Sequence, residues 1–115
     1  MATAAPLSRA SGSSSPGTTG FDYARMTIAE DPAEQARQAF RNVETALAEA
    51  GASLADVVRV RYYVPNPADW PLIVPVLGEV FGAIRPAATA LFCGLVDPRM
   101  KIEIEVTARR ASDTR

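Results

Sequence analysis

The stretch AATALFCGLVDPRMKIEIEVTA, residues 87–108, carries the clearest structural pattern of the chain. Apolar and polar side chains alternate from Met100 to Ala108, which is the period of two that a half-buried β-strand shows. Residues 87–96 predict a second strand, and Asp97-Pro98-Arg99 between the two has the composition of a tight turn. We therefore expect a sheet with one apolar face and one charged face.

A third strand is expected at residues 57–64, VVRVRYYV, because β-branched and aromatic residues dominate this segment. Its apolar face is expected to carry Val58, Val60 and Tyr62, and its opposite face Arg59, Arg61 and Tyr63. The two arginines complement Glu103 and Glu105 of the last strand. Two alternatives are open for this charged face, because it either meets water or is enclosed between subunits.

A first helix is predicted from Asp31-Pro32 to residue 50. Aspartate is a good N-cap, proline suits the first helical position, and Gly51 favours a left-handed C-cap. The apolar stripe consists of Ala36, Phe40, Val43, Leu47 and Ala50. This spacing is typical of an amphipathic helix with one buried face.

A second helix is predicted between the strands, capped by Asp69, ending at Gly82 and kinked at Pro75. It carries Trp70, Ile73, Leu77, Val80 and Phe81. The resulting helix–strand–helix–strand–strand order predicts an α+β sandwich with both helices on one face of the sheet.

Composition limits the function classes. The 115 residues suffice for one domain, which we place at residues 16–110 between a flexible tail at 1–15 and a short tail at 111–115. A net charge of −1 does not favour nucleic acid or membrane partners. The chain has no histidine, so zinc sites and Ser-His-Asp hydrolysis are not expected, and no metal or cofactor is predicted. The one cysteine, Cys93, indicates a reducing compartment, and we expect a cytoplasmic protein.

Four segments together resemble the Rid family (reactive intermediate deaminase, also called YjgF) in order and spacing. They are QARQAFRNVETALAEAGASLADVVRVRYYV, ADW with EVFG, RPAATALFCGL, and KIEIEVTARR. The resemblance implies a chorismate-mutase-like fold, with a mixed, mostly antiparallel sheet and two helices on one face. It also implies a homotrimer with a central β-barrel, and small ligands bound in clefts between subunits.

The resemblance also implies a chemistry, the hydrolysis of enamines and imines to ketoacids and ammonia. The family anchors its substrate carboxylate with the arginine of a Pro-Ala-Arg-Ser/Thr motif, where this chain has Ala88. Glu103 matches the glutamate implicated with the attacking water and is the predicted catalytic residue. Arg85 is expected to project to the opposite face from Ala88 because the offset is odd. Arg59, Arg61 or Arg9 of a neighbouring subunit are alternative anchors.

The remaining predicted site residues are carried over from the same resemblance. Gly17-Thr18-Thr19-Gly20 resembles a family loop that lines the cleft, although the segment before it is too polar for the usual strand. The predicted ligand-binding residues are Gly17, Thr18, Ala88, Thr89, Ala90 and Phe92. Trp70 is expected to be a core or interface anchor, and Cys93 a buried small hydrophobe.

Three functions follow from these residues. The first is a divergent Rid protein that binds or processes a small molecule, for example as an accessory enzyme of a biosynthetic pathway, because alanine at position 88 favours apolar contact over carboxylate binding. The second is an imine or enamine deaminase with a non-standard substrate, which Glu103 would serve. The third is RNA cleavage or a chaperone-like role, both attributed to the family; RNA cleavage is disfavoured by the missing histidine and basic stripe.

Overall fold

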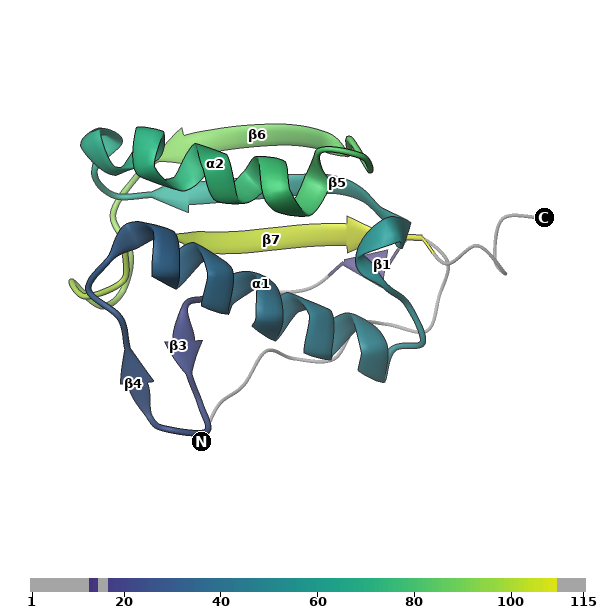
Figure 1. Cartoon of the computed structure of the whole chain (residues 1–115), viewed down its shortest axis with the longest axis horizontal. Helices are drawn as coiled ribbons and strands as arrows, with labels where there is room; N and C mark the ends of the chain where they lie inside the picture. The colour runs from purple at the N-terminus through teal and green to yellow at the C-terminus, as the bar shows by residue number, and fades with distance from the viewer. Residues whose placement is uncertain (1–12, 15–16, 110–115) are drawn as a thin grey trace.

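Two helices cover one face of a mixed sheet (Figure 1). The structure is a computed structural model that describes residues 13–14 and 17–109. The main sheet contains β1 (Ser13–Ser14), β2 (Thr18–Thr19), β5 (Val57–Val64), β6 (Ala87–Phe92) and β7 (Glu103–Ala108), and the helices are α1 (Pro32–Glu49) and α2 (Trp70–Phe81). A separate hairpin joins β3 (Phe21–Asp22) to β4 (Thr27–Ile28), and short 3-10 helices span Leu54–Asp56 and Pro67–Asp69. The predicted α+β architecture is confirmed.

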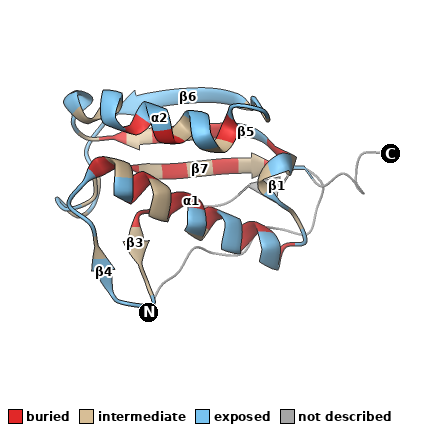
Figure 2. Ribbon diagram, in the orientation of Figure 1, coloured by how far each residue is buried: buried red, intermediate tan, exposed pale blue. Residues whose placement is uncertain are grey.

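The strand order of the main sheet is β1-β7-β5-β6, and β2 also pairs with β7. β6 runs parallel to β5, while β7 runs antiparallel to β5, β1 and β2. β6 therefore pairs on one side only in the described part of the chain and forms an edge of the sheet. Figure 2 shows the contrast, because β6 is exposed along its length while β7 alternates between buried and half-buried residues.

The N-terminal boundary of the sheet differs from the prediction. Ser13 and Ser14 were assigned to a flexible tail, but they pair with Ala108 and Thr107 at the edge of β7. Strand pairing uses backbone N–H and C=O groups, so two serines suffice where the edge of β7 offers partners. The rest of the predicted tails, residues 1–12, 15 and 111–115, lies outside the described residues.

Helix α1 has the predicted ends. The Asp31 side chain accepts a hydrogen bond from the backbone N–H of Glu34 at 3.0 Å. At the other end Gly51 has φ 77°, and the N–H of Ala52 donates to the carbonyl of Leu47 at 2.8 Å, which is the bond of a Schellman C-cap. The whole predicted stripe is buried, at Ala36, Phe40, Val43, Leu47 and Ala50.

Helix α2 is confirmed between the predicted positions Asp69 and Gly82, but neither residue caps it in the predicted way. The Asp69 side chain makes no capping bond; Asn66 instead caps the preceding 3-10 helix by accepting from the N–H of Ala68 at 3.0 Å. Gly82 has φ −55° and continues the helical conformation, so it is no left-handed cap. Pro75 lies inside the helix, and the predicted kink stays a prediction.

Both strand predictions at the C-terminal end were too long. β6 stops at Phe92, where its partner β5 stops at Val64, and one further bond runs from the N–H of Cys93 to the carbonyl of Val64 at 3.2 Å. The turn before β7 is confirmed by a bond from the N–H of Met100 to the carbonyl of Asp97 at 2.9 Å. Residues 93–102 thus connect β6 to β7 without strand pairing.

The alternation of β5 is broken at one residue. Val58 was predicted on the apolar face but is 50% exposed, because the register with β7 shifts between Val57 and Arg59. Such a bulge places one extra residue on one strand and turns its side chain out of the pattern. From Val60 onward the alternation holds, with Val60 and Tyr62 buried against the helices.

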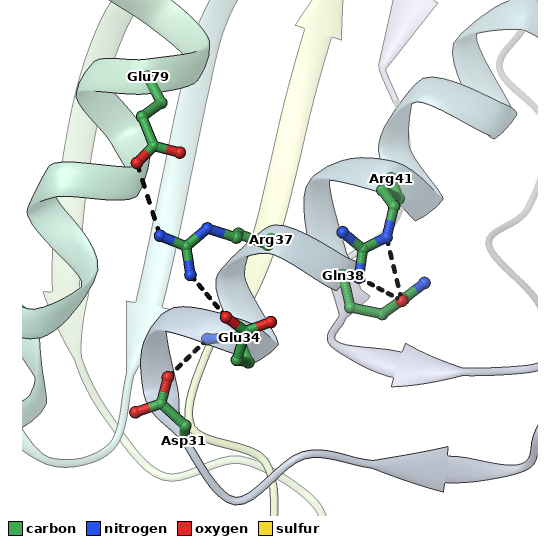
Figure 3. Close-up of polar contacts among 6 residues, drawn as sticks. All are labelled: Asp31, Glu34, Arg37, Gln38, Arg41 and Glu79. Atoms are coloured by element: carbon green, nitrogen blue, oxygen red, sulfur yellow. Dashed lines mark hydrogen bonds and ion pairs between the residues drawn. The ribbon is translucent and has the colours of Figure 1, made fainter.

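Polar bonds hold the two helices and the connection before β7 in place. Arg37 of α1 contacts Glu34 at 2.7 Å and reaches across to Glu79 of α2 at 3.5 Å (Figure 3). Gln35 is fully buried, and its side chain bonds the carbonyls of Ala29 and Arg99 and the backbone N–H of Lys101. These contacts join α1 to α2, to the segment before it and to the connection that leads into β7.

Candidate functional site

A groove of about 410 Å³ runs between α2 and the edge strand β6. This volume is within the range of small-molecule pockets, and most of the lining is apolar. Its aromatic members are Tyr62, Trp70 and Phe81, and burial raises the pKa of the Tyr62 phenol, which stays neutral. The groove is therefore suited to an apolar or aromatic group.

Small side chains on β6 create the space of the groove. Ala88 lies opposite Val60 and Ala90 opposite Tyr62 in the parallel pairing with β5, so both point to the helix side of the sheet. Both line the groove, together with the helix residue Gly78. A larger side chain at position 88 would occupy the volume that alanine leaves open.

Aromatic contacts hold Trp70, one of the residues that line the groove, in place. Trp70 stands 5.9 Å from Tyr62 and 6.4 Å from Phe92 between ring centroids, the second pair in a T-shaped arrangement. Trp70 was predicted as a core or interface anchor; it is half-buried, packs against the core and also lines the groove. Phe92 is 53% exposed and supports Trp70 without itself lining the groove.

Arg85 lines the same groove as Ala88, so the prediction that it projects to the opposite face was wrong. β6 begins only at Ala87, and Arg85 precedes it in a left-handed conformation with φ 55°. Its N–H donates to the carbonyl of Phe81 at 2.8 Å, which closes the C-terminus of α2. The argument from an odd offset applies only within a regular strand, and Arg85 lies outside it.

Glu103 lies on the other face of the sheet. It pairs with Tyr63 across the β5–β7 ladder, on the face that carries the arginines of β5. Burial and the neighbouring Glu105 raise the pKa of the Glu103 carboxyl. A Cβ at Gly17 would collide with this carboxylate, so a side chain at position 17 would displace the Glu103 side chain.

The ion pair of this face involves the second glutamate. Glu105 accepts a hydrogen bond from the Tyr63 hydroxyl at 3.0 Å and lies 3.8 Å from Arg61. Within the described residues Glu103 forms no ion pair with Arg59 or Arg61. The alternative interpretation of Glu103 as half of such a pair is therefore not observed in the single chain.

The predicted site residues fall into two groups. Ala88, Thr89 and Ala90 line the groove, and Gly17 lies against Glu103 on the opposite face, two strands away. Thr18 is only 2% exposed and its hydroxyl has no hydrogen-bond partner among the described residues, so its side chain faces the core. A single chain does not bring Glu103 to the groove. Arg9 lies outside the described residues.

Sequence reasoning missed part of the groove lining and misplaced both Arg85 and Cys93. The sequence did not indicate that Tyr62, Gly78 and Phe81 line the groove. The groove exists because β6 lies at the edge of the sheet, and local periodicity does not show which strand is an edge strand. Cys93 was predicted to be buried but is exposed, just past the end of β6. A glycine inside an otherwise apolar helical segment was the one sequence feature that could have pointed to a role for Gly78 in the groove.

The described part of the chain, 13–14 and 17–109, holds no cluster of three or more histidine, cysteine, aspartate or glutamate side chains suited to a metal ion. Over the same residues, neither helix is long and apolar enough to cross a membrane.

Comparison with known proteins gives consistent matches. The family model described as Endoribonuclease L-PSP matches residues 13–110. An uncharacterized Streptomyces coelicolor protein, SCO2049, is 32% identical over 97 residues, which are 84% of this chain and 72% of that protein. Mycobacterium tuberculosis Rv2704, a member of the highly conserved YjgF/YER057c/UK114 family, is similar in structure with TM-score 0.78 and 38% identity, over 87% of this chain and 80% of that one. RidA from Psychrobacter sp. PAMC 21119 matches with TM-score 0.81 and 25% identity, over 95% and 87%.

Proposed function

This chain belongs to the Endoribonuclease L-PSP family, also called the YjgF, Rid or UK114 family, and from that membership we propose that it binds or processes a largely apolar small molecule. The ligand is taken into the groove between α2 and β6. Another copy of the chain completes the site, as in the homotrimer that the resemblance implies.

The observation that carries this proposal is the chemistry of the groove lining. Ala88 stands where the family motif has arginine, and its methyl group leaves apolar volume between Trp70 and Phe81. Removing an aromatic or branched aliphatic group from water into such a space contributes about 25 cal/mol per Å² of apolar surface. A ligand with an apolar body thus gains most of its binding free energy here.

The exposed edge at β6 supports assembly with further copies. Leu91 and Phe92 are large, apolar and about half exposed, and Val74 of α2 adds exposed apolar surface at the groove. An open strand edge with apolar side chains is a strong site for association. Assembly would also bring a Glu103 from another copy to a groove that lacks one.

A second candidate function, imine hydrolysis, is favoured by the state of Glu103. Its raised pKa and its lack of an ion pair among the described residues suit a group that exchanges a proton. Water adds to the imine carbon, and the carboxylate accepts one proton of that water and passes it to nitrogen, which gives a carbinolamine. The carbinol hydroxyl then loses its proton, by way of the carboxylate, to the same nitrogen as the C–N bond breaks, which releases ammonia and leaves a carbonyl compound.

Ammonia release tests the choice between binding and hydrolysis. Imino acids can be generated by an amino-acid oxidase and imines without a carboxylate by an amine oxidase, with catalase present. Wild type, Glu103→Gln and Ala88→Arg are compared. Hydrolysis by wild type that Glu103→Gln loses assigns the chain to imine hydrolysis. If only Ala88→Arg is active, the natural chain is a binding protein on this scaffold; activity unchanged by Glu103→Gln contradicts the role of that residue.

Subunit mixing tests whether the site is shared between copies. Gly78→Leu fills the groove and Glu103→Gln removes the carboxyl, so neither variant alone should hydrolyse the imines that wild type hydrolyses. In mixed oligomers some sites combine an open groove with an intact Glu103 from another copy, and activity should return. Size-exclusion chromatography with light scattering provides the oligomeric state, and a purely monomeric chain would contradict the shared site.

A further inference from the structure

One positive charge at the rim of the groove, that of Arg85, has no acidic partner among the residues that the structure describes. Arg85 is exposed, and its Nε donates to the carbonyl of Gly82 at 3.4 Å, at the long end of the hydrogen-bond range. Within the described residues its guanidinium forms no ion pair. Arg37, Arg61 and Arg99, in contrast, each lie 3.8 Å or less from a carboxylate.

The groove itself offers nothing to neutralise this charge. Arg85 is the only charged residue among the described residues of the lining. Glu79 of α2 forms an ion pair with Arg37 of α1 and does not line the groove. An anion that enters the groove therefore meets a guanidinium without competition from a protein carboxylate.

We propose that Arg85 is the anion anchor of this groove and that the ligand is a carboxylate with an apolar body. The inference rests on the proposed function and names the ligand class of the same site. The planar fork of a guanidinium binds the two oxygens of a carboxylate with parallel hydrogen bonds. The apolar body lies against Trp70, Phe81 and the two alanines of β6, where Ala88 and Ala90 leave room.

The backbone of Arg85 argues for a role in binding. Its left-handed conformation is one that glycine adopts freely and that other residues adopt at a cost. A positive charge does favour the carbonyl end of a helix, so a structural contribution is also expected. The two roles differ in one measurable respect, because only the anchor role makes ligand affinity depend on the charge of the ligand.

The experiment compares two probes of the same shape. Cyclohexylacetate carries the carboxylate, cyclohexylacetamide is its neutral counterpart, and neither absorbs where tryptophan is excited. Trp70 is the only tryptophan of the chain and lines the groove, so its fluorescence reports occupancy directly. The full-length chain is titrated with each probe as wild type, Arg85→Asn and Arg85→Lys. Asparagine is chosen because it tolerates a left-handed backbone.

We expect wild type to bind the carboxylate about tenfold more tightly than the amide, as one charge-assisted contact at an exposed rim provides. Arg85→Asn should reduce the carboxylate affinity to that of the amide and leave the amide affinity unchanged. Arg85→Lys should keep part of the preference, because the charge remains but the fork is lost. Arg41→Gln, on the exposed face of α1, is the matched control and should behave as wild type.

The contrary outcomes distinguish a failure of the Arg85 anchor from a failure of the groove as a ligand site. Equal affinity of wild type for both probes, or an unchanged preference in Arg85→Asn, refutes the anchor while the groove remains a ligand site. If neither probe binds wild type, both the anchor and the proposed function of the groove fail. Gly78→Leu, which places a side chain into the groove, should abolish the signal of both probes; a persisting signal would place them elsewhere and refute the proposal.

Discussion

The stability of a Gly78→Ala variant tests whether the groove beside α2 is open, because alanine favours the helix and its methyl group would enter the groove. Gly78 lies within α2 and lines the groove, and a Cβ at this position meets no atom within 4 Å. Glycine inside a helix costs roughly 0.5–1 kcal/mol relative to alanine, because it loses more conformational freedom on folding. We expect Gly78→Ala to raise the free energy of unfolding by this amount, and Tm by roughly 2–6 °C.

The assay is urea unfolding followed by circular dichroism, at one fixed protein concentration because assembly would add to the apparent stability. Gly94→Ala is the matched control, since a Cβ there also meets nothing within 4 Å but Gly94 lies in the connection after β6. The gain in the free energy of unfolding of Gly78→Ala, minus the gain of Gly94→Ala, measures the contribution of the helical position. A loss of stability in Gly78→Ala would mean that another segment lies against this position, and would refute an open groove.

Three further predictions concern the neighbouring features. Arg85→Gly should raise the free energy of unfolding by about 1 kcal/mol in thermal unfolding, because glycine relieves the left-handed backbone; an equal gain in Arg85→Ala would point to another cause. Gln35→Leu should lower it by about 2–4 kcal/mol in urea unfolding, since three backbone groups between 2.6 and 2.8 Å lose their partner; a loss below 1 kcal/mol would contradict this. Because the pKa of Glu103 is raised above 4.5, the folded chain favours the protonated acid and stability falls as pH rises from 4.5 through that pKa. Glu103→Gln should therefore be more stable than wild type at pH 7 and equal to it at pH 3; an advantage that persists at pH 3 would contradict the assignment.

Local patterns predicted the elements whose determinants are local. The stripe of α1 and the cap at Gly51 depend only on residues within one helix, and both are confirmed. The alternation of β7 is likewise complete within one strand. In contrast, Val58 was misassigned because a bulge depends on the register with another strand. Cys93 was misassigned because an edge strand looks like a central strand in sequence.

The sequence motifs singled out only some residues of the candidate site, and they carried no information about its arrangement. Matching motifs singled out Ala88 and Glu103, yet no local pattern indicates that they lie on opposite faces and two strands apart. The place of Arg85 depends on a single left-handed residue between the helix and β6. One backbone angle decided whether this side chain belonged to the groove, and periodicity carries no information about such an angle.

The groove collects residues that local structure does not favour. Alanine would suit the helix better than Gly78, glycine would suit the left-handed turn better than Arg85, and a β-branched residue would suit the strand better than Ala88. All three line the same groove, two of them leaving space and one placing a charge at the rim. Departures from local preference are expected where function imposes its own requirements. Their convergence on one surface supports the proposal that this groove binds a ligand with an apolar body and an anionic group.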